Sequence, residues 1–113
     1  MPADLLAQRI AARASLARAR ASRLRGVASE AARQLRTLGA TRVILFGSLA
    51  SGAHPHADSD IDLCVEGLAQ GPVERFRLDA SGHGDRLDIV RWETASPELR
   101  AVIETYGESL EDG

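Results

Sequence analysis

Residues 43–65 constrain the fold most, because two apolar runs in this stretch are separated by a loop of small and polar residues. The first run ends abruptly at Gly47, and the second carries two carboxylates, Asp60 and Asp62. Side chains of a strand alternate between its faces, so the two carboxylates point one way and the apolar residues of the same run point the other. We therefore predict a pair of strands at the centre of the fold, with a charged pair on one of them.

This charged pair predicts a metal site. Neighbouring carboxylates repel each other unless a cation lies between them, and hard cations such as Mg²⁺ prefer oxygen ligands. The alternative, two strand-edge acids without a function, is disfavoured because like charges at i and i+2 of an apolar strand destabilise it. Gly47 would allow phosphate oxygens to approach the backbone closely, and Ser48 offers a hydroxyl and a backbone N–H at a helix start. A metal site facing a phosphate loop is therefore expected.

A third carboxylate on a neighbouring strand would complete such a site. Asp88 is the candidate, since it is the sole acid inside the third predicted strand, residues 86–92, and interrupts its apolar residues. A buried carboxylate without a partner is costly, so this side chain either pairs with another group or serves a metal ion. Asp85 and Glu93 lie at the ends of the strand and are expected to be solvated.

The motifs of residues 45–52 and 59–63 resemble those of the polymerase-beta-like nucleotidyltransferases, in which Gly-Ser and a small-residue loop precede Asp-x-Asp on a strand. They look most like the minimal nucleotidyltransferases (MNT) of bacteria and archaea. Members of the family commonly carry Arg on either side of the motif's Ala, where this chain has Leu49 and Ser51. That departure would weaken triphosphate binding or alter the choice of nucleotide.

The resemblance implies a specific activity. Asp60, Asp62 and Asp88 would hold one or two Mg²⁺ ions, with Asp88 at the position of the family's third acid and as the candidate general base. Gly47 and Ser48 would bind the nucleotide. The reaction would transfer AMP from ATP to a hydroxyl. In the specific version that the resemblance implies, the chain is the antitoxin of a toxin–antitoxin pair that binds a helical HEPN ribonuclease and adenylylates one of its tyrosines.

Size and composition fit one soluble domain. The chain has 113 residues, of which 44% are hydrophobic and 27% charged. No run approaches the roughly 18 apolar residues of a membrane helix, and the Arg-rich N-terminal region does not resemble a secretory signal, so a cytoplasmic location is expected. Cys64 is the sole cysteine, which excludes an intrachain disulfide, and we expect it to be a small buried side chain.

Positive charge is concentrated in the first part of the chain. Residues 1–42 contain nine Arg and two acids, a net charge of +7, whereas residues 43–113 contain five Arg and fourteen acids, a net charge of −9. This asymmetry indicates an acidic partner or nucleic acid for the basic half, and a solvated helix face is the alternative.

The basic region has a helical pattern over residues 3–38, with apolar residues at steps of three and four. A helix of that length would measure roughly 54 Å, longer than a small domain is wide. It is therefore expected either to break near Gly26 or to project from the globule. We divide the chain into a helical extension, residues 1–22, and a minimal nucleotidyltransferase domain, residues 23–113. The Ala-rich face of the extension would need a partner, or a second copy in a homo-oligomer, to be buried.

The predicted fold class is α/β (α+β): a small mixed sheet of three to four strands with flanking helices, in the polymerase-beta-like arrangement. Ser96 and Pro97 mark the start of the last helix, and residues 108–113 are expected to form a frayed acidic tail. The strands are predicted at residues 42–46, 60–65 and 86–92, and the shorter helices at residues 72–80 and 97–106.

Two further functions remain open at this point. A chain of this size has no room for a separate acceptor-binding domain, so another macromolecule is expected to present the acceptor. An MNT-fold module that neutralises its partner by binding alone is the first alternative, and the missing motif arginines support it. Nucleic-acid binding through the Arg-rich helix is the second.

Overall fold

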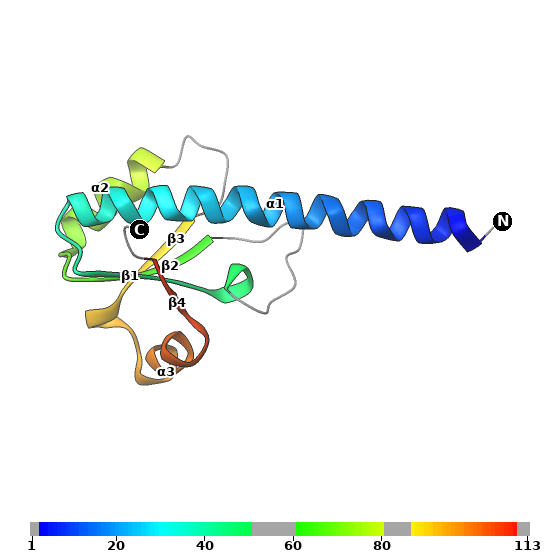
Figure 1. Cartoon of the computed structure of the whole chain (residues 1–113). Helices are drawn as coiled ribbons and strands as arrows, with labels where there is room; N and C mark the ends of the chain where they lie inside the picture. Colours follow the sequence, from blue (N-terminus) through cyan, green and yellow to red (C-terminus); the bar gives the residue numbers. More distant parts are fainter. Residues whose placement is uncertain (1–2, 51–60, 81–86, 111–113) are drawn as a thin grey trace.

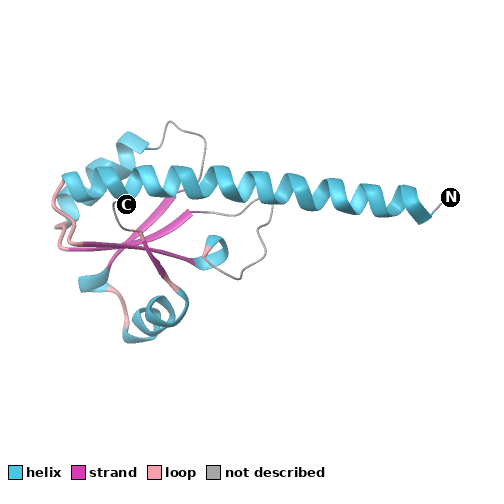
Figure 2. Cartoon of the chain, in the orientation of Figure 1, coloured by secondary structure: helices cyan, strands magenta, loops and turns pink. Residues whose placement is uncertain are grey.

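The computed structural model describes residues 3–50, 61–80 and 87–110, in a mixed α+β arrangement around one four-stranded sheet (Figures 1 and 2). The predicted fold class is confirmed. In chain order the elements are α1 (Ala3–Thr37), β1 (Arg42–Phe46), the 3₁₀ turn η1 (Gly47–Leu49), β2 (Ile61–Glu66), α2 (Gln70–Ala80), β3 (Leu87–Arg91), the 3₁₀ turn η3 (Trp92–Thr94), α3 (Pro97–Tyr106) and β4 (Glu108–Ser109).

The strand order in the sheet is β3-β2-β1-β4. β2 runs antiparallel to β1 and parallel to β3, and helix α2 makes the crossover between these two parallel strands. The three predicted strands are confirmed, with boundaries that differ by a residue or so from the predicted ones.

β4 was not expected. Glu108 and Ser109 pair with Leu45 and Ile44 of β1, and the N–H of Leu110 donates to the carbonyl of Val43 at 2.9 Å. The prediction of a frayed tail is therefore wrong for residues 108–110, while residues 111–113 lie outside the described part of the chain. β1 is flanked by β2 on its other side, so the short segment covers an edge that would otherwise be open.

Helices cover both faces of the sheet (Figure 2). α1 and α2 pack on one face, where Leu45, Leu63 and Ile89 belong to the larger core cluster. α3 packs on the other face through Ile103, which is buried with Ile44 and Cys64. β1 is thus covered on both sides, as its continuous apolar sequence predicts.

α1 is continuous through Gly26, so the predicted break does not occur and the N-terminal part of the helix projects from the body (Figure 1). Its 35 residues correspond to about 52 Å. The predicted boundary at residue 22 falls within this helix, and Leu24 is the first of its side chains to be fully buried in the core. The helix ends at Thr37. Gly39 follows with φ +122° and donates its N–H to the carbonyl of Arg36 at 2.9 Å, while the Ala40 N–H donates to the carbonyl of Leu35 at 3.0 Å.

Three apolar side chains in or next to the helices are exposed. Val102 is adjacent to the buried Ile103, but the narrow stripe that a ten-residue helix turns to the sheet leaves it 46% exposed. Leu38 follows the last helical residue and is 50% exposed, and Leu78 of α2 faces away from the sheet. The predicted cap of α3 is confirmed, because the Ser96 hydroxyl accepts from the Leu99 N–H at 3.1 Å.

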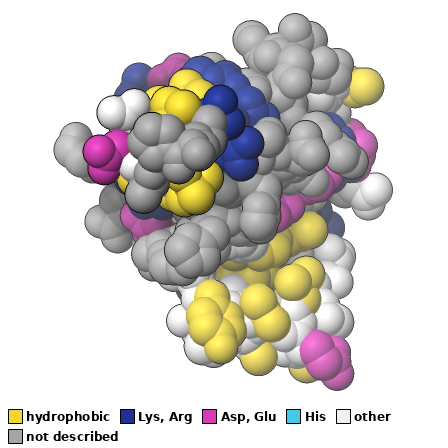
Figure 3. Space-filling view, turned by 90° about the vertical axis from the view of Figure 1, so that its right-hand side faces the viewer, with side chains coloured by type: hydrophobic (Ala, Val, Ile, Leu, Met, Phe, Trp, Pro, Cys, Tyr) yellow, Lys and Arg dark blue, Asp and Glu magenta, His cyan; other side chains and the backbone are white. Residues whose placement is uncertain are grey.

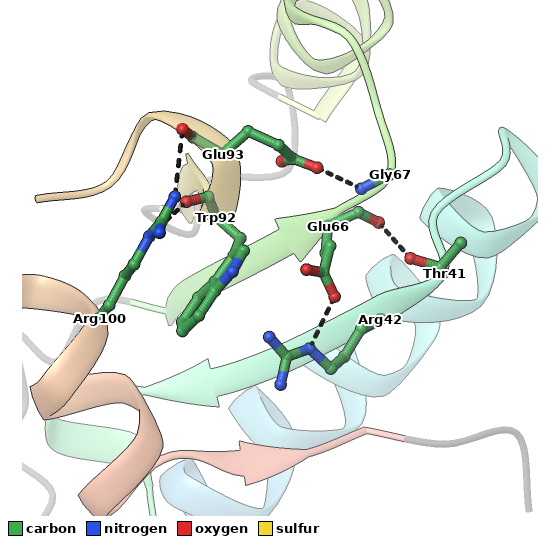
Figure 4. Close-up of polar contacts among 7 residues, drawn as sticks. All are labelled: Thr41, Arg42, Glu66, Gly67, Trp92, Glu93 and Arg100. Atoms are coloured by element: carbon green, nitrogen blue, oxygen red, sulfur yellow. Dashed lines mark hydrogen bonds and ion pairs between the residues drawn. The ribbon is translucent and has the colours of Figure 1, made fainter. Parts of the chain in front are cut away.

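Polar contacts join α3 to the end of the sheet at which β1 begins (Figure 4). The Trp92 ring lies between two guanidinium groups, that of Arg42 at 4.7 Å and that of Arg100 at 5.0 Å from its centroid. Arg42 also pairs with Glu66 at 3.1 Å, and Arg100 Nε donates to the Trp92 carbonyl at 2.9 Å. These contacts hold α3 in place at the end of the sheet away from Gly47.

Within the described part of the chain, no helix combines the length and the apolarity that a bilayer span requires.

Candidate active site

The site is built where β1 ends and β2 begins. Phe46 and Asp62 are register partners on these antiparallel strands, so Gly47 follows directly beside the Asp62 side chain. A Cβ atom at position 47 would lie 2.2 Å from Oδ2 of Asp62, closer than any non-bonded contact allows. The φ of Gly47 is +76°, a conformation that other residues adopt only at a cost. A side chain at position 47 would therefore occupy the space that the Asp62 carboxylate fills.

Asp88 lies beside Asp62 on the neighbouring strand. The two residues are register partners of the parallel strands β2 and β3, so their side chains leave the same face of the sheet. Neighbouring strands lie about 4.8 Å apart, which places the two carboxylates close to each other. α3 covers this face of the sheet at Ile44 and Cys64, which are buried. On the same face Asp62 is half-buried and Asp88 is exposed. The fold thus brings two carboxylates together at one end of the sheet.

Asp88 is exposed, although the apolar residues around it in its strand predict a buried position. We selected this residue because a carboxylate within an apolar strand is costly when buried, and that reason does not apply to an exposed side chain. Its place beside Asp62 comes from strand register instead.

Part of the predicted site lies outside the described residues. This applies to Asp60, the first acid of the motif, to Ser51 and to the side chain of Ser48. Among the residues that the structure does describe, no group of three or more His, Cys, Asp or Glu side chains is placed to hold a metal ion. The predicted set of three carboxylates therefore stays a prediction, with Asp62 and Asp88 brought together.

A short 3₁₀ turn follows β1, at the place where we expected the start of a helix. η1 spans three residues and closes with a hydrogen bond from the Ala50 N–H to the Gly47 carbonyl at 3.1 Å. So few aligned peptides carry little macrodipole, which leaves individual backbone N–H groups as the donors for an anion. Leu49 is 4% exposed and belongs to the core on the α1 side of the sheet, so this position, where the family commonly has Arg, does not face solvent.

Arg25, which no local sequence pattern singles out, fixes this turn from α1. Its Nη1 donates to the Leu49 carbonyl at 2.8 Å, and its Nη2 pairs with Glu108 of β4 at 2.5 Å. These partners lie 24 and 83 residues away along the chain, beyond the reach of any local pattern. Arg25 thereby links the first helix, the turn of the site and the last strand.

Cys64 takes no part in this chemistry. Burial raises the pKa of its thiol to about 11, so the side chain stays protonated at neutral pH. Its exposed fraction is 1%, which confirms the predicted small buried side chain.

A family model for the nucleotidyltransferase domain matches residues 28–100, well over half of the chain. The chain belongs to the nucleotidyltransferase domain family. Gly47, Asp62 and Asp88 all lie within the matched part, whereas Arg25 and Glu108 lie outside it. No curated protein sequence matches the chain.

Solved structures of toxin–antitoxin complexes share the fold of this nucleotidyltransferase domain. A toxin–antitoxin with AMP-PNP is 25% identical with a TM-score of 0.61, over 75% of this chain and 73% of that one. A mutant of the MntA–HpeT toxin–antitoxin is 26% identical with a TM-score of 0.54, over 66% of this chain. The match spans 62% of the length of that mutant's chain. The MntA–HepT complex, 21% identical with a TM-score of 0.56, shows the fold alone. These neighbours confirm the resemblance to minimal nucleotidyltransferases that the sequence motifs carry.

Proposed function

We propose that this protein is a Mg²⁺-dependent nucleotidyltransferase that transfers AMP from ATP to a hydroxyl of a partner protein. The partner in this proposal is a HEPN-type toxin, and the chain is the antitoxin of the pair. The observation that carries the proposal is the alignment of Asp62 with Asp88 beside Gly47, inside the part of the chain that matches the nucleotidyltransferase family. A cytoplasmic location, where ATP is available, belongs to the same proposal.

The donor set fits a magnesium ion. Asp62 and Asp88 offer carboxylate oxygens on one face of the sheet, and their mutual repulsion favours a cation between them. Asp60, two residues before Asp62, would add a third carboxylate. When bound, Mg²⁺ would neutralise triphosphate charge and lower the pKa of the attacking hydroxyl.

The residues of the chain have separate tasks in the proposed reaction. Gly47 leaves the backbone of η1 accessible, so that its N–H groups can bind phosphate oxygens. The acceptor oxygen forms a bond to the α-phosphorus of ATP, the bond between the α-phosphorus and the bridging oxygen breaks, and pyrophosphate leaves. The exposed Asp88 carboxylate is the candidate to accept the hydroxyl proton.

Two structural neighbours support a nucleotide substrate and a role for paired aspartates. One was crystallised with AMP-PNP, an ATP analogue. The other is a mutant in which two aspartates, two positions apart, are replaced by glutamate, and Asp60 and Asp62 have the same spacing.

One observation favours a second candidate function. Position 49 carries a buried leucine in place of the family's arginine, so it contributes no charge to a triphosphate. A module that neutralises its partner by binding alone would tolerate this loss.

The two functions separate in one experiment. The full chain is incubated with α-labelled ATP, Mg²⁺ and the protein encoded by the adjacent gene, with and without EDTA. We expect label on the partner, none with EDTA, and transfer reduced about 100-fold or more in Asp62→Asn and Asp88→Asn. Asp79→Asn, a change of an exposed aspartate on α2, is the matched control and should leave transfer unchanged.

Binding without transfer would decide for the second function. If the wild-type chain transfers no label and Asp62→Asn still suppresses the partner, the enzymatic proposal is wrong. Label transfer that Asp62→Asn and Asp88→Asn leave unchanged would place the chemistry elsewhere in the chain.

A further inference from the structure

The projecting part of α1, residues 3–22, forms a feature of its own, which we call the arm. It projects from the body of the molecule (Figure 1) and lies wholly outside residues 28–100, which match the nucleotidyltransferase family. The structure exposes its large apolar side chains: Leu6 is 56%, Ile10 59% and Leu16 71% exposed. Large apolar side chains gathered on an exposed surface are typical of a site that contacts another molecule.

Two of these exposed side chains, Leu6 and Ile10, continue the buried stripe of the same helix. Leu24, Ala28 and Leu35 pack in the core at helical spacing. Counting back by three and four residues from Leu24, the same stripe passes through Ile10 and Leu6. The stripe is covered by the sheet in the second half of α1, whereas Ile10 and Leu6, which belong to the arm, are exposed.

A row of arginines lies next to this stripe. Arg9, Arg13 and Arg20 each follow a stripe position by three residues, namely positions 6, 10 and 17, and residues three apart are neighbours on a helix surface. Figure 3, which looks onto the end of the molecule from which α1 projects, shows hydrophobic and basic side chains side by side over this helix.

Charge decides what kind of surface fits the arm. The arm contains four arginines and one acid, Asp4, for a net charge of +3. The arm of a second copy would bring the same positive charge against it. Nucleic acid would neutralise the arginines but would leave Leu6 and Ile10 in water. A protein helix with an apolar stripe flanked by acidic residues would cover the apolar stripe of the arm and pair with its arginines at the same time.

We propose that the arm is a docking surface for an acidic amphipathic helix of the partner protein. The identity of that partner as the product of the adjacent gene rests on the proposed function, whereas the chemistry of the docking helix rests on the arm alone. The arm would hold the partner while Asp62 and Asp88, at the end of the sheet, act on the acceptor hydroxyl.

Binding of the purified partner to the full chain tests this proposal. The affinity is measured by isothermal titration for the wild type, for Leu6→Gln/Ile10→Gln and for Arg9→Glu/Arg13→Glu. We expect each double variant to weaken binding at least about tenfold, since each removes one of the two matched rows. Both changes lie on an exposed helix surface and use good helix formers, so circular dichroism should show unchanged folding.

Two control variants test whether the apolar stripe and the arginine row matter by their position, and not through a general change in charge or surface hydrophobicity. Arg18→Glu is the same type of substitution with half the charge change of Arg9→Glu/Arg13→Glu, and Arg18 lies on the opposite side of the helix from the arginine row. Leu78→Gln removes an exposed leucine, 73% accessible, from α2. Neither control should change the affinity by more than about twofold.

Several results would overturn the proposal. The double variants could bind the partner as tightly as the wild type does. Sedimentation could show a dimer of the chain that Leu6→Gln/Ile10→Gln dissociates, which would make a second copy the occupant. A labelled DNA duplex could bind the arm with an affinity that falls steeply with salt, while the arm variants leave the affinity for the partner unchanged. That result would make nucleic acid the occupant.

Failure of the docking proposal and failure of the proposed function give different results. If the arm variants weaken binding of the partner, but neither the wild type nor any variant transfers AMP, the docking proposal is supported and the enzymatic function is not. If AMP is transferred and the arm variants change neither the affinity nor the KM for the partner, the function stands and the docking surface does not.

Discussion

The carboxylate of Asp62 occupies the position that a side chain of residue 47 would take. The virtual Cβ of Gly47 lies 2.2 Å from Oδ2 of Asp62, and φ at this residue is +76°. The glycine of the first motif and the aspartate of the second are therefore one structural unit, although the loop between the two motifs separates them in the sequence.

Gly47→Ala should fold and lose activity. The carboxylate is the flexible end of its side chain, so it would turn away from the new methyl group, and the left-handed φ would cost about 1–2 kcal/mol. We expect AMP transfer to fall much more than this stability change explains. Urea unfolding and label transfer measure the two effects. Gly71→Ala, where nothing lies within 4 Å of the new Cβ, is the control and should leave AMP transfer unchanged.

Arg25→Ala should loosen the turn of the site. The change removes a hydrogen bond to the Leu49 carbonyl and an ion pair with Glu108, both partly exposed, so we expect the free energy of unfolding to fall by about 1–2 kcal/mol. A double-mutant cycle with Glu108→Gln isolates the ion pair, whose share should shrink in high salt. Arg33→Ala, which breaks a more exposed pair with Glu30, should cost less than about 0.5 kcal/mol. Equal costs for the two arginines would contradict the role of Arg25.

Two glycines should respond to alanine in opposite ways. Gly26 lies in the middle of α1 with nothing within 4 Å of a new Cβ, so Gly26→Ala should stabilise the protein by about 0.5–1 kcal/mol. At Gly107 the Cβ would lie 2.3 Å from the Ile103 carbonyl oxygen and 2.5 Å from Ile44, so Gly107→Ala should destabilise it by about 1–3 kcal/mol. Thermal unfolding of both variants checks the signs. A lower melting temperature for Gly26→Ala would show that the helix needs flexibility at this position.

Cys64 should make stability fall at high pH. Burial raises the pKa of the folded thiol from its ordinary value of 9.0 to about 11, so between these values the unfolded chain releases a proton that the folded chain keeps. The free energy of unfolding therefore falls as the pH rises from about 9 to about 11, and this contribution is absent below pH 9. Urea titrations of the wild type and of Cys64→Ala across this range measure the difference. The same slope in both proteins would assign the pH dependence to other groups.

The sequence by itself determined the elements and the chemistry they carry. Apolar runs placed β1, β2 and β3, the Ser96 cap and Pro97 placed the start of α3, and the Gly-Ser and Asp-x-Asp motifs indicated the nucleotidyltransferase family. These are local signals, because side-chain alternation, capping and turn residues act over a few neighbouring positions.

Only the tertiary structure decided which residues meet. The register of β2 with β3 places Asp88 beside Asp62. Glu108 and Ser109, expected to be part of a frayed tail, pair with β1 as an edge strand. Arg25 of α1 donates a hydrogen bond to the turn that follows β1. Each of these contacts joins segments far apart in the chain, where no short-range pattern constrains the partner. The same holds for exposure: the length of the helical pattern left open whether the helix breaks or projects, and in the structure it continues past the sheet, which leaves Leu6 and Ile10 exposed.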